Sequence, residues 1–130
     1  MPSFTFKKEE RLKSRKIIGS LFKEGKSFSM FPLRLVWKVV DREQKYPVQF
    51  TVSIPKRSFP RAVHRNQIRR KVREAYRLQK HLLYEALADH DQQYALMFLF
   101  IGKKAMTYQE IDHAVNKVIK RFIRQLNKGK

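Results

Sequence analysis

Cysteine is absent from this chain of 130 residues, so disulfide bonds and thiolate chemistry are excluded. Acidic residues are scarce as well: 11 Asp and Glu stand against 30 Lys and Arg, giving a formal net charge of +19. An excess of this size indicates an anionic partner, with nucleic acid ahead of an acidic membrane surface. A basic protein without such a partner is the weaker interpretation, because a large net charge costs self-repulsion.

Long hydrophobic runs are also lacking. The longest, residues 94–101, is too short to span a bilayer. The chain begins Met-Pro-Ser-Phe, which is not the apolar segment of a secretion signal. We therefore expect a cytoplasmic protein with no membrane partner.

The composition nevertheless supports a packed core, since 42% of the residues are hydrophobic and ten are Phe. The length fits one domain across residues 1–130. No linker or internal repeat divides it. Residues 1–6 and 127–130 are the candidate disordered tails.

Three segments have the spacing of amphipathic helices. The first is expected over residues 8–24, with Gly25 as its stop signal. The second follows Pro55, with Ser58 as its N-cap and Pro60 in its first turn. The third starts at a capping box made by Thr107 and Glu110. Its apolar positions are Ile111, Ala114, Val115, Val118, Ile119, Phe122 and Leu126.

Three further segments read as strands. Residues 33–40 and 48–54 alternate between apolar and other side chains, and 94–101 is apolar on both faces. Together the elements predict an α/β (α+β) two-layer sandwich. Its mixed sheet has three to four strands, and the order is helix, strand, strand, helix, strand, helix.

The second helix carries an unusual charge pattern. Residues 56–80, KRSFPRAVHRNQIRRKVREAYRLQK, hold ten Lys or Arg against one acid, Glu74. Along it Arg recurs at every fourth position, so like charges stack and repel by up to ~0.5 kcal/mol per adjacent pair. A polyanion would turn this repulsion into attraction. The recurring positions are Arg61, Arg65, Arg69, Arg73 and Arg77.

A helical wheel divides this helix into two faces. The buried stripe comprises Ile68, Val72, Ala75, Tyr76, Leu82 and Leu83. The opposite face comprises Asn66, Arg69, Arg70, Arg73, Arg77 and Lys80, with Arg61 and Arg65 at the helix entrance. Arg grips phosphate with a planar, permanently charged fork. An ordinary solvated face would mix in more acids, so we interpret this one as a phosphate contact.

Other chemistry is less well supported. Phe22, Phe28, Phe31 and Trp37 are candidates for stacking on unpaired bases, although for any single Phe the core is the more common place. The four His have no metal-ligand spacing and the acids are scattered, so we expect no catalytic residue and no metal site on the chain.

The arginine-rich segment and its surroundings resemble a known family. "RNQIRRKVREAYRLQK" after "VSIPKRSFPRAVH", together with "RLKSRKIIGSLFKEGKSF" near the start, resembles the bacterial ribonuclease P protein subunit. The likeness extends from Phe6 to the last helix. It implies a left-handed crossover between two parallel strands, which general topology rules do not predict.

The resemblance also implies a function. Ribonuclease P is a ribonucleoprotein endonuclease that removes the 5′ leader of precursor tRNA, and its RNA is the catalyst, with Mg²⁺ held mainly by RNA. The protein is an auxiliary subunit that binds this RNA and the leader. By motif matching, the residues for the catalytic RNA are Lys56, Arg57, Arg61, Arg65, Asn66, Arg69, Arg70, Arg73 and Arg77. Those for the leader cleft are Phe22, Arg34, Val36, Lys38, Thr51 and Ser53.

The sequence departs from the family pattern at three positions. Gln67 stands where the second arginine of an Arg-Asn-Arg triplet is usual, Ile18 where an aromatic is frequent, and Val36 where a cleft aromatic can occur. Base stacking would then be weaker, or would be supplied by Phe28, Phe31 or Trp37.

Rival functions remain open on the residues alone. A structural ribosomal protein is also small, basic and α/β, and a membrane-surface helix would be basic too. A DNA-binding helix would need more base-reading Asn or Gln than Asn66 and Gln67 supply, so no DNA partner is expected.

Overall fold

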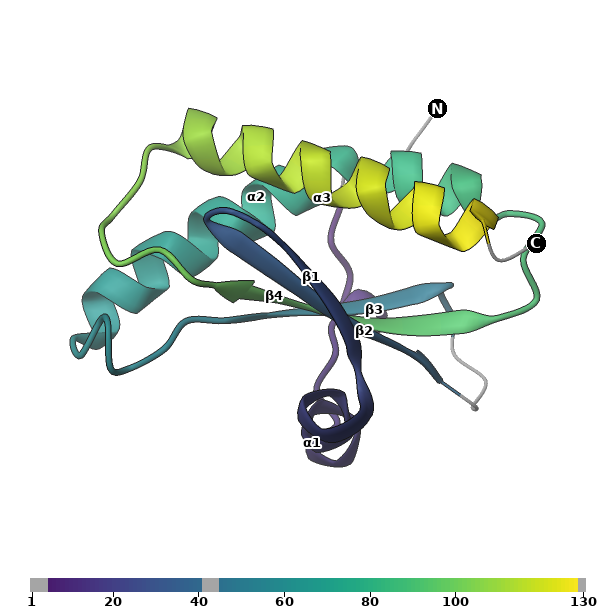
Figure 1. Ribbon diagram of the computed structural model, residues 1–130, viewed down its shortest axis with the longest axis horizontal. Helices are drawn as coiled ribbons and strands as arrows, with labels where there is room; N and C mark the ends of the chain where they lie inside the picture. Colours follow the sequence, from purple (N-terminus) through teal and green to yellow (C-terminus); the bar gives the residue numbers. More distant parts are fainter. Residues whose placement is uncertain (1–4, 41–44, 129–130) are drawn as a thin grey trace.

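A computed structural model describes residues 5–40 and 45–128 as a four-stranded sheet with three α-helices (Figure 1). The elements are a 3-10 helix (Lys8–Glu10), α1 (Arg15–Glu24), β1 (Lys26–Met30), β2 (Leu33–Val40), β3 (Val48–Ser53), α2 (Ala62–Ala86), β4 (Gln93–Phe100) and α3 (Tyr108–Lys128). The expected α/β fold, with its three helices and mixed sheet, is confirmed.

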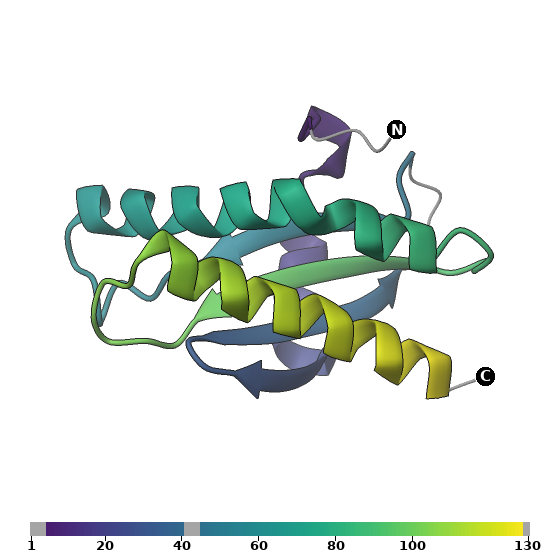
Figure 2. The ribbon, with the colours of Figure 1, turned by 90° about the horizontal axis from the view of Figure 1, so that it is seen from above.

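The strands lie in the order β1-β2-β4-β3. β2 is antiparallel to both β1 and β4, whereas β3 runs parallel to β4. Helix α2 is the crossover between the two parallel strands (Figure 2). Ser53 pairs with Leu99, so β3 and β4 end at the same edge of the sheet. The left-handedness of this crossover connection stays a prediction.

Helices α2 and α3 cover one face of the sheet, and α1 lies on the other (Figure 1). The main core lies under α2 and α3, where Phe50 of β3 stacks on Tyr76 of α2 with ring centroids 3.8 Å apart. Inward-pointing residues of the strands alternate as expected: Val48, Phe50 and Val52 are all buried. The capping box is confirmed too, since the Glu110 amide donates to Thr107 Oγ1 at 3.1 Å.

Helix α1 closes a second, smaller core on the opposite face. It consists of Leu12, Leu21, Val36, Val40, Ala95 and Met97. Gly25 lets the chain approach the sheet here: an added Cβ would lie 2.7 Å from Val36 Cγ1 and 2.4 Å from the Leu21 carbonyl oxygen. The face of the sheet opposite the main core is therefore partly apolar, and α1 covers it.

The prediction of a first helix over residues 8–24 is wrong for its first half. A 3-10 turn comes first, and Arg11 then bridges in parallel to Phe50 at the edge of the sheet. The Leu12 amide donates to the Phe50 carbonyl at 2.9 Å. Helix α1 begins only after Ser14, whose hydroxyl accepts the Ile17 amide at 3.2 Å. Pairing with β3 and this N-cap together stop a helix from running through Leu12.

The start of α2 is also later than expected. Ser58 is not the N-cap and Pro60 is not in the first turn, because the helix begins at Ala62 with Arg61 before it. Phe59 is buried against Phe100, with ring centroids 5.7 Å apart. That burial holds the connection in a turn before the helix can start.

Two more expectations need correction. Lys80, placed on the exposed face of α2, is 2% exposed. Phe6 lies in an expected tail but packs edge-on against Phe50, at 5.8 Å between ring centroids, and α3 continues through Lys128. Residues 1–4 and 129–130 of the expected tails lie outside the described residues.

Candidate nucleic-acid interface

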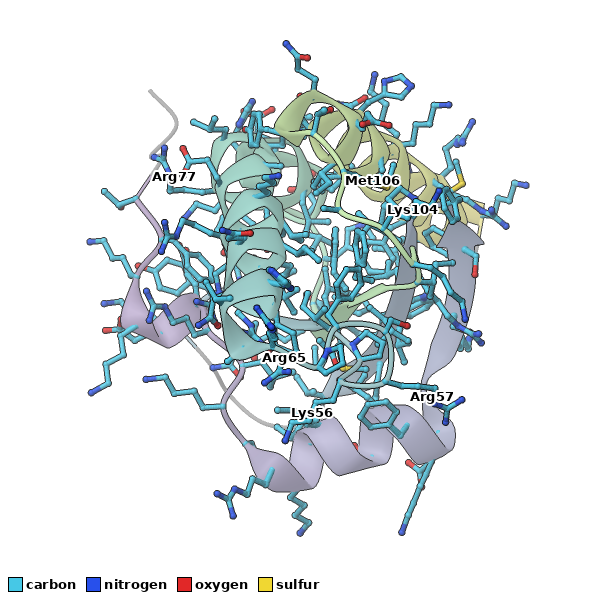
Figure 3. All side chains as sticks on the ribbon, turned by 90° about the vertical axis from the view of Figure 1, so that its left-hand side faces the viewer. Lys56, Arg57, Arg65, Arg77, Lys104 and Met106 are labelled. Atoms are coloured by element: carbon cyan, nitrogen blue, oxygen red, sulfur yellow. The ribbon has the colours of Figure 1, made fainter. Side chains whose placement is uncertain are left out.

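Cationic loops gather at the end of the sheet where β3 and β4 stop. Lys56 and Arg57 follow β3, and Lys103 and Lys104 follow β4, and all four are exposed. Figure 3 looks onto this end and places Lys56 and Arg57 between α2 and α1, with Lys104 on the loop leading to α3. Lys71 of α2 holds that loop by donating to the Met106 carbonyl at 2.8 Å.

Arg65, one of the predicted RNA-binding residues, stabilises the N-terminus of α2 by hydrogen bonds to the preceding turn. The Arg65 guanidinium donates to the carbonyls of Phe59 and Pro60, each at 2.8 Å. These bonds satisfy carbonyls of a turn that lacks a side-chain N-cap. Arg65 thus holds the turn that precedes α2, and Arg61, the residue before the helix, is exposed.

The rest of the predicted arginine face lies on the outer side of α2. Arg70 and Arg73 are exposed, while Arg69 is half-buried and donates to Asn66 Oδ1 at 2.7 Å. Arg77 pairs with Glu74, at 2.5 Å between Nη2 and Oε1. Within residues 5–40 and 45–128, no carboxylate lies at ion-pair distance from Arg69, Arg70 or Arg73.

The electrostatics of this face reflect that imbalance. The Arg73 guanidinium is partly desolvated against the helix, and this lowers its pKa. The nearby positive charges of Arg11 and Arg69 lower the pKa of Arg73 further. The hydrogen bond to Glu74 raises the pKa of Arg77 instead. Both groups stay cationic at neutral pH, so the face presents fixed positive charge to a polyanion.

The predicted leader-cleft positions lie on the α1 side of the sheet. Phe22 is 62% exposed at the end of α1, and Thr51 and Ser53 are half-buried on edge strand β3. Arg34 donates to Ser27 Oγ at 2.9 Å, and Lys38 pairs with Glu24 at 2.9 Å. These five residues share one face of the sheet with α1.

Val36 does not contribute an open surface to this face. It is only 7% exposed and packs among the side chains under α1. Its assignment to the cleft must therefore be corrected to a supporting position beneath the helix, because an apolar side chain there gains more from burial than from exposure.

The four candidate stacking aromatics separate into two groups. Phe22 and Phe31 are 62% and 70% exposed, whereas Phe28 and Trp37 are buried. The Phe28 ring also lies under the Arg121 guanidinium, 4.5 Å from the ring centroid. Base stacking is thus open to Phe22 and Phe31 only.

Some cationic residues of the candidate interface were not predicted from the sequence. Lys103 and Lys104 reach the cationic end because β4 runs parallel to β3, and the Gly-Lys-Lys after that strand was the available signal. Arg11 lies beside Arg73, but it was placed inside a helix that does not form there.

In the part of the chain that the structure describes, no three His, Asp or Glu side chains gather as possible ligands of a metal ion. None of the helices in the described segments is long and apolar enough to cross a membrane.

Comparison with known proteins identifies the family. The ribonuclease P family model matches residues 6–123. The ribonuclease P protein component of Porphyromonas gingivalis is 36% identical over 121 residues, covering 93% of this chain and 88% of the relative. The protein component of Chlorobaculum tepidum is 30% identical, covering 92% and 86%.

Solved structures agree on the fold. The ribonuclease P protein of Thermotoga maritima superposes with a TM-score of 0.67 at 20% identity, covering 86% of this chain and 96% of that one. The Staphylococcus aureus protein gives 0.66 at 20% identity, covering 85% and 93%. The chain therefore belongs to the ribonuclease P protein component family, the auxiliary subunits of the metal-dependent ribonucleoprotein that processes tRNA 5′ ends.

Proposed function

We propose that this chain binds the catalytic RNA of ribonuclease P through the arginine face of α2, and the 5′ leader of precursor tRNA on the α1 side of the sheet. The observation that carries the proposal is the outer face of α2, where Arg69, Arg70 and Arg73 have no carboxylate partner among the described residues. A duplex or folded RNA offers phosphates at a spacing that such a helix can follow.

The division into two contacts follows from the position of β3. This edge strand lies next to α2 on one side, and its outward residues Thr51 and Ser53 face the α1 side. Lys56 and Arg57 continue from its end between the two helices. An RNA bound along α2 and a single strand bound near α1 would therefore be neighbours without sharing contacts.

The leader contact explains why such a subunit would favour precursor over product. Only the precursor carries the single-stranded leader, so any contact with it is lost in the mature tRNA. A differential contact of about 1.4 kcal/mol gives tenfold discrimination. Phe22 supplies an exposed ring for a base, and Arg34 and Lys38 supply charge for the backbone.

The chemistry of cleavage belongs, in this proposal, to the RNA. RNA phosphates would hold the Mg²⁺, which would supply Lewis-acid chemistry for the cleavage. The protein places positive charge against phosphates and thereby lowers the repulsion between catalytic RNA and substrate. We expect it to act in the cytoplasm, with no DNA or membrane partner.

The test adds the purified chain to a bacterial ribonuclease P RNA at low Mg²⁺ and follows cleavage of precursor tRNA with a long leader. The expected result is faster cleavage at the mature 5′ end, with the RNA alone as the reference. A folded chain that leaves the rate unchanged would overturn the proposal. A basic ribosomal protein of similar size is the matched control for nonspecific charge.

A further inference from the structure

A cavity of about 470 Å³ lies between the N-terminal segment and the outer face of α2. Arg11 lines it from the N-terminal segment and Arg73 from the helix, together with neighbouring α2 residues. Phe6 forms an apolar part of the lining. Figure 3 shows the N-terminal segment running beside α2, between the levels of Arg65 and Arg77.

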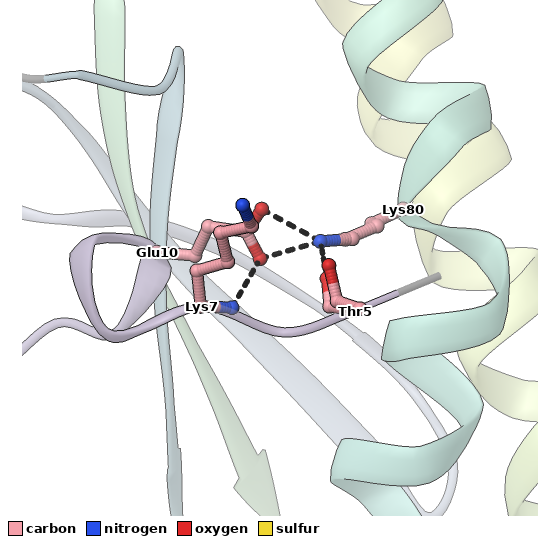
Figure 4. A network of polar contacts seen from close by, with 4 residues as sticks. All are labelled: Thr5, Lys7, Glu10 and Lys80. Carbon is pink, nitrogen blue, oxygen red and sulfur yellow. Dashed lines mark hydrogen bonds and ion pairs between the residues drawn. The ribbon is translucent and has the colours of Figure 1, made fainter. Parts of the chain in front are cut away.

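The outer wall of this cavity is fixed by buried contacts. Lys80 reaches from α2 to both carboxylate oxygens of Glu10, at 2.6 and 2.5 Å, and also donates to the Thr5 carbonyl (Figure 4). The Lys7 amide donates to Glu10 as well, at 3.3 Å. Glu10 and Lys80 are 3% and 2% exposed. A segment held in this way keeps the next residue, Arg11, at a set place beside α2.

Phe6 adds a second anchor. Its ring packs edge-on against Phe50 and Tyr76, with centroids 5.8 and 6.0 Å away. The Arg11 guanidinium lies over the Phe6 ring, 5.4 Å from the ring centroid. The cation–π contact orients Arg11 without neutralising it.

Arg11 and Arg73, which both line the cavity, have no acidic partner among the described residues. Glu74, the acid in the lining, is engaged with Arg77 at 2.5 Å. In the described ranges neither Arg11 nor Arg73 has a carboxylate within ion-pair distance. The charge of Arg11 is close enough to contribute to the lowered pKa of Arg73. Guanidinium groups held together from two separate elements suit one bridging oxyanion.

We propose that this cavity binds one phosphate group of RNA, with Arg11 and Arg73 as ligands from opposite walls. The inference rests on the proposed function and deepens it: the RNA-binding surface includes the N-terminal segment as well as α2. Inorganic phosphate shares the same chemistry, so the experiment must separate the two sources.

The main experiment measures the affinity of Arg11→Ala for ribonuclease P RNA, without substrate, over a series of NaCl concentrations. We expect about tenfold weaker binding, because a charge-assisted contact is lost, and a salt slope smaller by roughly one. The matched control is Arg15→Ala, which removes the same charge from an exposed site four residues away. It should change affinity less than about twofold.

Equal losses in Arg11→Ala and Arg15→Ala would mean a diffuse charge effect and would overturn the site. Both side chains are exposed, so both variants should keep the fold, which far-ultraviolet circular dichroism checks. If Arg69→Ala and Arg73→Ala weaken binding while Arg11→Ala does not, the cavity is refuted and the proposed function stands. If the wild-type chain does not bind the RNA, both are refuted.

The second arm identifies the source of the phosphate. Wild type and Arg11→Ala are titrated with inorganic phosphate while NMR follows the side-chain Nε–H signals of arginine. We expect chemical-shift changes at the Arg73 Nε–H signal, with an affinity for phosphate in the millimolar range. These changes should disappear in Arg11→Ala, the variant that also loses affinity for RNA. Phosphate shifts that depend on Arg11 with unchanged RNA affinity would assign the cavity to a free anion and overturn the RNA contact.

Discussion

Glu10 and Lys80, 70 residues apart in sequence, form an ion pair in which both side chains are almost fully buried. Taking two charges out of water is costly, and the cost is offset only by good geometry and additional hydrogen bonds. Here the Thr5 carbonyl and the Lys7 amide supply those bonds. The pair thereby joins the N-terminal segment to the C-terminal half of α2 (Figure 4).

Removing one partner of this pair should be strongly destabilising. Lys80→Met leaves Glu10 buried without its counter-ion, and we expect the free energy of unfolding to fall by about 3–5 kcal/mol. Urea denaturation followed by circular dichroism measures it. The double variant Glu10→Met with Lys80→Met should recover most of the loss, since an apolar pair of similar volume can replace a buried ion pair.

The comparison variant is Lys38→Met, which breaks the exposed pair with Glu24 and should leave the unfolding midpoint almost unchanged. Equal effects of Lys80→Met and Lys38→Met would show that the Glu10–Lys80 pair is open to solvent in solution.

Two glycines should respond to alanine in opposite directions. Gly25→Ala forces a methyl group against Val36 and the Leu21 carbonyl, so we expect a loss of about 1–3 kcal/mol. Gly19 lies within α1 and has nothing within 4 Å of an added Cβ, so Gly19→Ala should stabilise by about 0.5–1 kcal/mol. Thermal unfolding of both variants measures the difference. Stabilisation by both would mean that α1 does not pack closely on the sheet.

The cap of α3 should make stability depend on pH. Hydrogen bonds from the Thr107 amide, and then from its hydroxyl, hold the pKa of Glu110 below its usual 4.5. Because the folded-state pKa is depressed, this stabilisation is fully present above pH 4.5 and is lost as pH falls through the folded value. Glu110→Gln keeps an acceptor but cannot be protonated, so it should lose less stability with acid than wild type. Denaturation midpoints across this range decide it, and identical acid slopes would contradict the cap's role.

Phe22 should matter for the leader and not for the fold. Its ring is 62% exposed, so Phe22→Ala should change stability by less than about 0.5 kcal/mol. If the ring stacks on a leader base, binding of leader-bearing precursor should weaken by roughly 1–3 kcal/mol. Leaderless tRNA is the control substrate and should bind as before. A similar loss for both substrates would point to general damage at the end of α1.

Periodicity predicted the elements that bury one continuous face. β2, β3, β4 and the start of α3 were placed within one residue, because burial on one surface requires spacing of two or of three to four residues. β1 was not predicted as a strand, since Phe28 is its one buried residue and Met30 is its one other apolar residue. Two apolar positions are too few to establish an alternating pattern.

Lys80 shows the other limit. It stands four residues after Tyr76 and three before Leu83, so spacing favoured burial, while its charge favoured exposure. Its placement on the exposed face was wrong, because the partner that permits burial of the charge, Glu10, lies far away in sequence. The predicted RNA-binding residues were more accessible to sequence reasoning, since a run of arginine on one helix needs no distant partner.

The shared edge at which β3 and β4 end has a thermodynamic consequence. The pair Lys56 and Arg57 is far from the pair Lys103 and Lys104 in an unfolded chain, and folding brings the two pairs together, as it brings Arg11 to the α2 arginines. The native state therefore carries repulsion that the unfolded state largely escapes, and dissolved ions screen it. Salt should thus act on this protein in two opposite senses, raising its melting temperature in isolation while weakening its hold on RNA.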